Sequence, residues 1–186
     1  MVMISTKRKF LLGLSGIAIA VSAPVFAKTP GILRNAGDIR SIRLRNDKTS
    51  EQLDAVYWIE GSYISEVLKQ INYFMRDWRQ NKQITYDVAN IDIMSATQAL
   101  LDTEEYMQLL SGYRTKKTNR MLSRGNKGVA QNSYHIRGMA ADLRMSSRSV
   151  SQIAKAAEAC KSGGVGRYPN SGFVHIDCGP LRKWNK

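Results

Sequence analysis

The chain contains two histidines, and each is followed by an aspartate at a spacing that could bring the two side chains together. His135 lies seven positions before Asp142, and His175 lies two positions before Asp177. On a β-strand, residues two apart point to the same face, so a strand would present the His175 imidazole beside the Asp177 carboxylate. Imidazole nitrogen and carboxylate oxygen both bind zinc, and three such ligands with an open fourth position form a catalytic site. The pattern indicates a single-metal site, with hydrogen-bonded structural histidines as the alternative.

The composition is that of a globular protein with a strong basic excess. The 186 residues include 28 Lys and Arg against 15 Asp and Glu, for a net charge of +13, and 43% are hydrophobic. This suits one folded domain and excludes a largely disordered chain. Two cysteines exclude a disulfide-rich miniature scaffold and a four-cysteine zinc finger. The positive charge indicates an anionic partner, either nucleic acid, lipid headgroups or cell-wall polymer.

Residues 1–27 have the three parts of a secretory signal peptide. A basic stretch at 7–9 precedes an apolar run from Phe10 to about Val21, and a small-residue stop ends at Ala27. We expect cleavage after Ala27, because the apolar run is too short to span a bilayer. The basic stretch also resembles a twin-arginine signal with its first arginine replaced by lysine. The mature chain keeps a charge of +10, and its exported location favours wall polymer over nucleic acid as the partner.

The rest of the chain predicts a single α+β domain without repeats or linkers. Residues 28–58 read as an extended segment and a hairpin, whose strands we expect at about 39–44 and 53–58. Apolar periodicity predicts helices at 63–79, with Ser62 as a possible cap, and at 91–101. The second half predicts strands at 107–110, 140–145, 165–168 and 173–178, and helices at 118–124 and 150–161. We expect a small, mostly antiparallel sheet that carries the metal site and is flanked by helices.

Several motifs then occur in an order that resembles a known superfamily. Ser-x-His-x-x-Gly-x-Ala-x-Asp at 133–142, preceded by Ser-Gly-Tyr-Arg at 111–114 and followed by His175-x-Asp177, resembles the zinc D-alanyl-D-alanine peptidases. The stretch 163–180 is similar to the murein endopeptidase K-like subgroup of exported bacterial proteins. The resemblance covers about residues 60–184 and implies a zinc peptidase domain at 59–186. It also implies a periplasmic hydrolase of peptidoglycan peptide cross-links, with one zinc ion held by His135, Asp142 and His175.

The resemblance also suggests roles for residues beside the metal. Arg114 corresponds to an arginine that meets substrate carboxylate or carbonyl groups, which a guanidinium can bind through two oxygens. Asp177 is the candidate for taking a proton from the attacking water and passing it to the leaving amine. Relatives often carry Glu three residues before the last histidine or a His-x-His pair, and this chain has neither. Asp177 could therefore be the third ligand instead, with His175 beside the attacked carbonyl.

Other residues have supporting roles in this interpretation. We expect Ser133 and Tyr168 to shape the substrate pocket, and Cys160 and Cys178 to form a disulfide in the oxidising periplasm. The alternatives to an endopeptidase are a D,D-carboxypeptidase and a non-catalytic peptidoglycan-binding module with a structural metal. We expect a monomer. The motifs do not choose between a bond from D-Ala to a diamino acid and a bond between two diamino acids.

Overall fold

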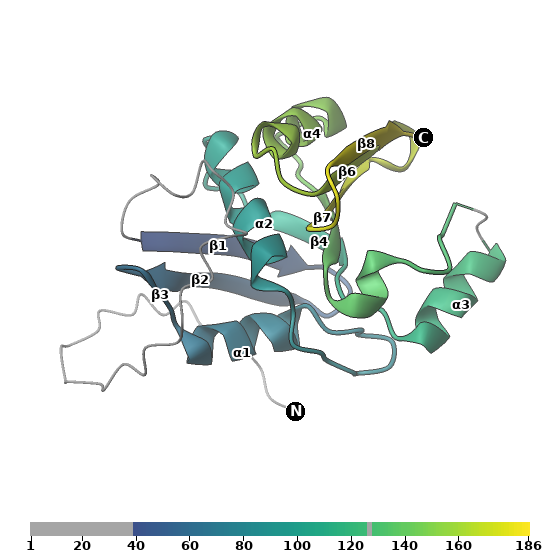
Figure 1. Ribbon diagram of the computed structural model, residues 1–186, viewed down its shortest axis with the longest axis horizontal. Helices are drawn as coiled ribbons and strands as arrows, with labels where there is room; N and C mark the ends of the chain where they lie inside the picture. The colour runs from purple at the N-terminus through teal and green to yellow at the C-terminus, as the bar shows by residue number, and fades with distance from the viewer. Residues whose placement is uncertain (1–38, 126–127) are drawn as a thin grey trace.

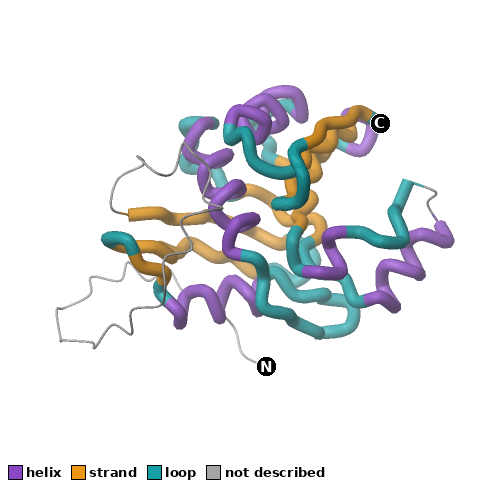
Figure 2. The backbone as a smooth tube through the Cα atoms, viewed as in Figure 1, coloured by secondary structure: helices purple, strands orange, loops and turns teal. Residues whose placement is uncertain are grey.

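The computed structural model describes residues 39–125 and 128–186, so the signal peptide and the segment 28–38 lie outside the described residues. The described chain is an α+β fold built on one eight-stranded mixed sheet with the order β3-β2-β1-β4-β5-β7-β6-β8 (Figures 1 and 2). The elements are β1 (Ile39–Asn46), β2 (Glu51–Ile59), β3 (Ser62–Tyr63), α1 (Ser65–Phe74), α2 (Val88–Leu100), β4 (Met107–Ser111), α3 (Lys116–Gly125), the 3-10 helix η3 (Tyr134–Arg137), β5 (Ala140–Arg144), α4 (Val150–Ala159), β6 (Gly164–Tyr168), the 3-10 helix η4 (Pro169–Ser171), β7 (Phe173–Asp177) and β8 (Arg182–Asn185). No helix among these residues is long and apolar enough to cross a membrane.

The predicted hairpin is confirmed as the antiparallel pair β1 and β2. Ile42, Leu44 and Tyr57 point to one face and are fully buried, whereas Val56 on the opposite face is 37% exposed. This alternation is the pattern of a sheet with one face on the core. Because β1 also pairs in parallel with β4, the hairpin and the second half of the chain share a single sheet.

The predicted helices are present, with boundaries set by local side chains. The first helix ends at Phe74 rather than Arg79, because Asp77 accepts a hydrogen bond from the Arg79 amide and forms a bridge with Lys82. Ser62 does not cap it, since Ser62 lies in β3 and the N-cap residue makes no side-chain hydrogen bond. Helix α2 begins three residues earlier than predicted, where the Asp87 carboxylate accepts from the Ala89 amide.

The strands of the second half pair mainly in antiparallel fashion, as predicted, but the sheet is larger than expected. Strand β7 lies between β5 and β6, and both pairings are antiparallel. The sequence analysis missed β8, which extends the sheet by pairing in parallel with β6. Val174 and Ile176 of β7 are fully buried in the core, so the alternate residues His175 and Asp177 point to the opposite face.

The predicted disulfide is not formed, and Cys160 and Cys178 are free thiols. The Cys160 sulfur lies 3.8 Å from the Thr97 hydroxyl, whereas burial and the neighbouring Asp87 raise the pKa of Cys178 to about 12. Thr97 and Asp87 are ten residues apart along α2 and its cap, which corresponds to about 15 Å of helix. The two thiols therefore face opposite ends of one helix, far beyond the reach of an S–S bond.

Candidate metal centre

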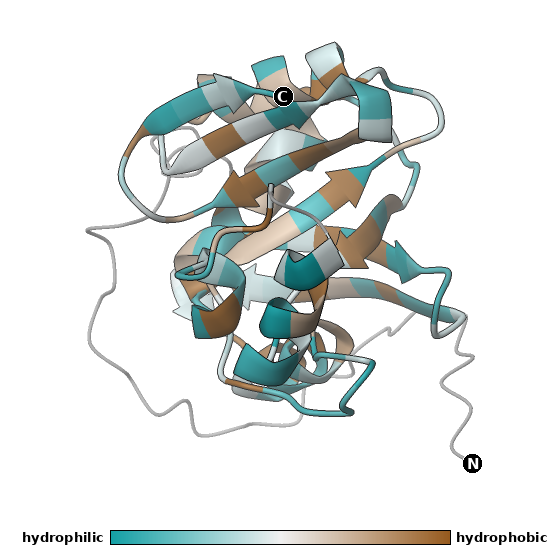
Figure 3. Ribbon diagram, turned by 90° about the vertical axis from the view of Figure 1, so that its right-hand side faces the viewer, coloured by the Kyte–Doolittle hydropathy of each residue, from teal (hydrophilic) through white to brown (hydrophobic). Residues whose placement is uncertain are grey.

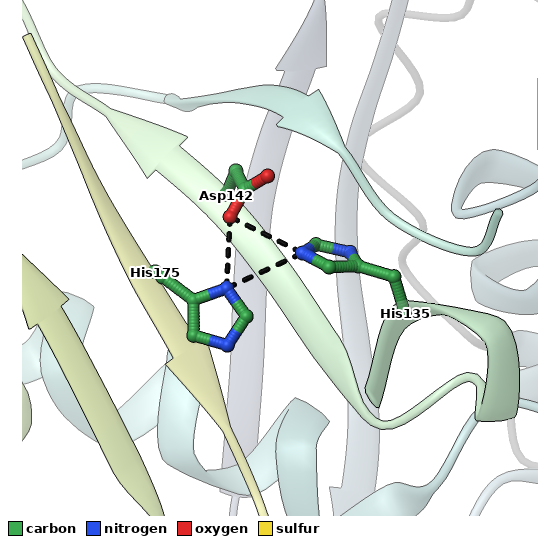
Figure 4. Close-up of side chains that lie close together, drawn as sticks. All are labelled: His135, Asp142 and His175. Carbon is green, nitrogen blue, oxygen red and sulfur yellow. Dashed lines mark hydrogen bonds and ion pairs between the residues drawn. The ribbon is translucent and has the colours of Figure 1, made fainter. Parts of the chain in front are cut away.

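His135, Asp142 and His175 meet in a triangle (Figure 4), on the face of β7 opposite to the fully buried Val174 and Ile176. His135 Nε2 lies 3.2 Å from Asp142 Oδ1 and 3.3 Å from His175 Nδ1, and His175 Nδ1 lies 2.9 Å from Asp142 Oδ1. Among the described residues, these three side chains form the group whose potential metal-binding atoms all lie within 4.8 Å of one another. The structure thus brings together the three residues that the sequence predicted as ligands.

Two of these residues are placed by strand pairing and the third by a short helix. Asp142 and His175 are directly opposite in the register of β5 and β7, so their side chains share one face. His135 lies in η3, where the Ser133 hydroxyl caps the helix by accepting from the His135 amide at 3.3 Å. The helix ends at Gly138, whose φ of 68° lies in the left-handed region that favours glycine.

The Ser-Gly-Tyr-Arg segment holds His135 from the other side. His135 Nδ1 donates to the Gly112 carbonyl at 2.7 Å, and the Arg114 amide donates to the His135 carbonyl at 3.1 Å. The first contact fixes the imidazole with Nε2 unprotonated and directed at the triangle. The segment passes close to the end of α1, so close that a Cβ on Gly112 would lie 2.5 Å from the Met75 carbonyl oxygen. Glycine at this motif position therefore permits the approach.

The donor set fits a zinc ion. Tetrahedral zinc with ligand distances near 2.0–2.1 Å requires ligand atoms about 3.3 Å apart, and the three separations are 3.3, 3.2 and 2.9 Å. The His135 side chain is 2% exposed, whereas those of Asp142 and His175 are 10% and 12% exposed. One edge of the triangle is therefore open to a further ligand, as in catalytic rather than structural metal sites.

The electrostatics also suit cation binding. Burial would raise the pKa of Asp142, but His135, His175 and Arg114 hold that pKa well below its usual value. Burial lowers the pKa of His135, which keeps this imidazole neutral and ready to act as a ligand at neutral pH. For His175, burial opposes protonation, but the carboxylates on either side raise its pKa above the usual value. A bound cation would therefore compete with a proton at His175.

Arg114 lies beside the triangle, as the motif predicted. Its guanidinium contacts Asp142 Oδ2, the oxygen that does not face the histidines, and its Nε donates to the Ser111 hydroxyl at 2.7 Å. Arg114 is 9% exposed, so it forms a buried ion pair with a ligand carboxylate. The guanidinium fixes the Asp142 carboxylate in the orientation that points Oδ1 at both imidazoles.

Asp177 occupies a position that does not suit the proton-transfer role suggested by the sequence. Its Oδ2 lies 2.9 Å from His175 Nε2, on the side of the ring opposite the nitrogen that joins the triangle. The residue is fully buried, and its carboxylate also accepts from Arg182, Gly164 and Gly179. With its oxygens occupied and shielded from solvent, Asp177 supports His175 rather than facing a molecule at the open edge.

Aromatic residues line the remaining side of His175. Tyr168 stacks on Phe173 with ring centroids 4.4 Å apart, and its hydroxyl accepts from Trp184 Nε1 at 3.0 Å. The Trp184 ring lies 5.3 Å from the His175 ring, centroid to centroid. The sequence analysis missed both Trp184 and Arg182. Their only signal was the pair of glycines at 164 and 166, which pair directly with them in the neighbouring strand.

A buried His–Asp–His triangle with one open edge, carried on the outer face of a mixed sheet, could hold a metal ion in the way that single-metal hydrolases do. Comparison with known sequences agrees. The family model described as peptidoglycan L,D-endopeptidase MepK matches residues 34–184, and the chain belongs to this family.

Curated relatives match over nearly their whole length. The peptidoglycan L,D-endopeptidase MepK of Escherichia coli K12 is 40% identical over 182 residues, which cover 95% of this chain and 96% of the relative. The probable peptidoglycan L,D-endopeptidase MepK of Haemophilus influenzae is 34% identical over 179 residues, which cover 96% of this chain and 95% of the relative. No solved structure matches this chain. The comparisons therefore confirm the predicted peptidase superfamily and its murein endopeptidase K-like subgroup.

Proposed function

We propose that this protein is a periplasmic, zinc-dependent peptidoglycan endopeptidase that hydrolyses L,D peptide cross-links. The observation that carries the proposal is the convergence of three metal-ligating atoms within one zinc coordination sphere, in a member of a peptidoglycan L,D-endopeptidase family. An L,D bond joins an L-configured to a D-configured centre. Of the two bonds considered from the sequence, this favours the one between two diamino acids, because the other joins two D centres.

The side chains have distinct roles in this proposal. His135, Asp142 and His175 hold one zinc ion, which when bound supplies an acidified water at neutral pH and a Lewis acid for the peptide carbonyl. Arg114 keeps the Asp142 carboxylate oriented and presents positive charge to the carbonyl or carboxylate groups of the stem peptide. Ser133 positions His135 through the cap of η3, and Tyr168 forms part of the wall beside His175.

The basic surface beside the site supports an anionic substrate. No acidic residue occurs between Glu105 and Asp142, and helix α3, which follows Arg114 directly, exposes Lys116, Lys117 and Arg120. Figure 3 views the molecule from the side on which this helix projects. Peptidoglycan stem peptides carry free carboxylates, so this surface would attract them in a manner that salt screens. We expect the protein to act as a monomer after cleavage following Ala27.

Digestion of defined substrates tests the proposal. Zinc-loaded protein should split muropeptide dimers joined by an L,D bond, leave D,D-joined dimers intact and release no free D-Ala. Chelation or His135→Ala should abolish the reaction, and zinc should restore it only in the chelated wild type. Release of D-Ala from unlinked stem peptides would identify a carboxypeptidase. Sacculus binding without any change in the muropeptides would identify a binding module.

A further inference from the structure

Strand β8 places two large side chains opposite two glycines of β6. In the β6–β8 register, Arg182 faces Gly164 and Trp184 faces Gly166. A Cβ on Gly164 would lie 2.6 Å from Arg182 Nη1, and one on Gly166 would lie 2.4 Å from the Trp184 ring. Both distances are shorter than real Cβ contacts, so any other residue would displace the partner. The two glycines thus leave space for side chains that come from the neighbouring strand.

The same register continues from β6 into β7 and the candidate metal site. Gly166 pairs with His175, and Gly164 pairs with Asp177. Two rows of side chains therefore cross the sheet on one face. Neighbouring strands are about 4.8 Å apart, so β8 and β7 are separated by about twice that distance. The missing side chains on β6 allow Arg182 and Trp184 to reach across it to the residues of β7.

Arg182 makes a two-pronged contact with Asp177. Its Nη1 donates to Asp177 Oδ1 at 3.0 Å and its Nη2 donates to Oδ2 at 2.6 Å. The Gly164 and Gly179 amides also donate to Oδ1, at 3.2 and 2.9 Å. The carboxylate is therefore held in one plane and one orientation, with Oδ2 directed at His175 Nε2.

This arrangement determines which nitrogen of His175 is available. A carboxylate that is held by an arginine and two amides accepts a hydrogen bond, so His175 Nε2 carries the proton and Nδ1 carries the lone pair. Nδ1 is the atom that joins the triangle with His135 and Asp142. Carboxylates that contact a ligating imidazole in this way raise its basicity and fix its orientation.

We infer that Arg182 is a positioning residue for the metal site: acting through Asp177, it holds His175 with Nδ1 presented to the ion. This inference rests on the proposed zinc site. It assigns Asp177 to the support of His175, in place of proton transfer or direct ligation. It also makes the C-terminal strand, whose Trp184 ring packs beside His175, part of the machinery that binds the metal.

The test measures metal binding directly on the purified full chain. Arg182→Gln should lower the zinc affinity about tenfold or more in competition with a chromophoric chelator, within the range typical of residues that support a metal ligand. It should also alter the visible spectrum of the cobalt-substituted protein. Arg182→Lys, which keeps the charge but not the two-pronged geometry, should recover part of the affinity. Gly164→Ala should reproduce the loss without removing any donor, because its Cβ would lie 2.6 Å from Arg182 Nη1 and 2.7 Å from Asp177 Oδ2 and would push the two partners of this ion pair apart.

Lys183→Gln is the matched control, since Lys183 is an exposed residue of the same strand that points to the other face. It should leave zinc affinity and the cobalt spectrum unchanged. If folded Arg182→Gln and Gly164→Ala proteins bind zinc within about twofold of the wild type, the inference is wrong. If the wild type itself binds no zinc, the proposed function fails instead, so the two failures are distinguishable.

Discussion

Asp142→Asn is the most informative single change, because Asp142 joins both imidazoles and Arg114 in one cluster. The substitution keeps the shape of the side chain but removes its charge and the anionic ligand. We expect zinc affinity to fall by more than about 100-fold, beyond the 10–100-fold typical of residues that only support a ligand. Activity on cross-linked muropeptides should fall in parallel.

The stability cost follows from the burial of Arg114. The Arg114 side chain is 11% exposed, and removing its partner leaves a buried charge without a counter-ion, which costs about 3–5 kcal/mol. For a domain of this size each kcal/mol corresponds to about 2–4 °C in Tm, so the expected decrease is about 6–20 °C. Thermal unfolding should be followed in the presence of chelator, so that lost zinc binding does not contribute to the difference.

Asp92→Asn provides a matched control at a second buried carboxylate. Asp92 accepts hydrogen bonds from the Tyr57 and Tyr63 hydroxyls at 2.8 and 2.7 Å and forms a buried ion pair with Arg40 at 3.4 Å, in a cluster of α2, β1, β2 and β3 that contains none of the metal-site residues. Its substitution should also lower Tm but leave zinc affinity unchanged. Asp142→Asn protein that binds zinc within about threefold of the wild type would refute the assignment of Asp142 as a ligand.

Three further measurements address metal linkage, acid stability and the thiols. Free zinc at 1,000 times its Kd should stabilise the wild type by about 4 kcal/mol and raise Tm by roughly 8–16 °C, and an unchanged Tm would argue against a metal site. Asp77 accepts hydrogen bonds from the amide and the hydroxyl of Thr115. Burial alone would raise the pKa of Asp77, but these hydrogen bonds outweigh burial and lower the pKa from 3.8. The contribution of Asp77 to stability is present above pH 3.8 and is lost as the pH falls below that value. The Tm of the wild type should therefore exceed that of Asp77→Asn by less at low pH. An equal Tm difference at pH 3 and pH 6 would contradict this. Alkylation of the unfolded protein without reductant should add two labels, at Cys160 and Cys178, and a mass without labels would show a disulfide.

The residues that the sequence predicted well are those whose local pattern decides their structure. The apolar runs at 140–145 and 173–178 form β5 and β7, and the pairing of these strands brings Asp142 and His175 together. Motif spacing thus carried most of the information about the ligand triangle.

The features that the sequence did not predict depend on contacts between distant segments. Strand β8 has one large apolar residue, Trp184, and it is a strand because β6 offers a free edge beside it. The two-residue spacing of His175 and Asp177 correctly placed both on one face. It did not show which imidazole nitrogen each neighbour contacts, which depends on Arg182. The disulfide prediction failed for the same reason, because the sequence does not show that Cys160 and Cys178 lie beside opposite ends of α2.

The three candidate ligands come from segments that are up to 40 residues apart, and two of them meet only when β7 inserts between β5 and β6. Pairings between distant segments form late in folding, because the chain entropy of closing the intervening loops opposes them. A partly folded chain therefore has its histidines dispersed and no site to hold an ion. A peptidoglycan endopeptidase of this fold is therefore inert while it is unfolded, and its site is complete only when the final strands of the sheet are in register.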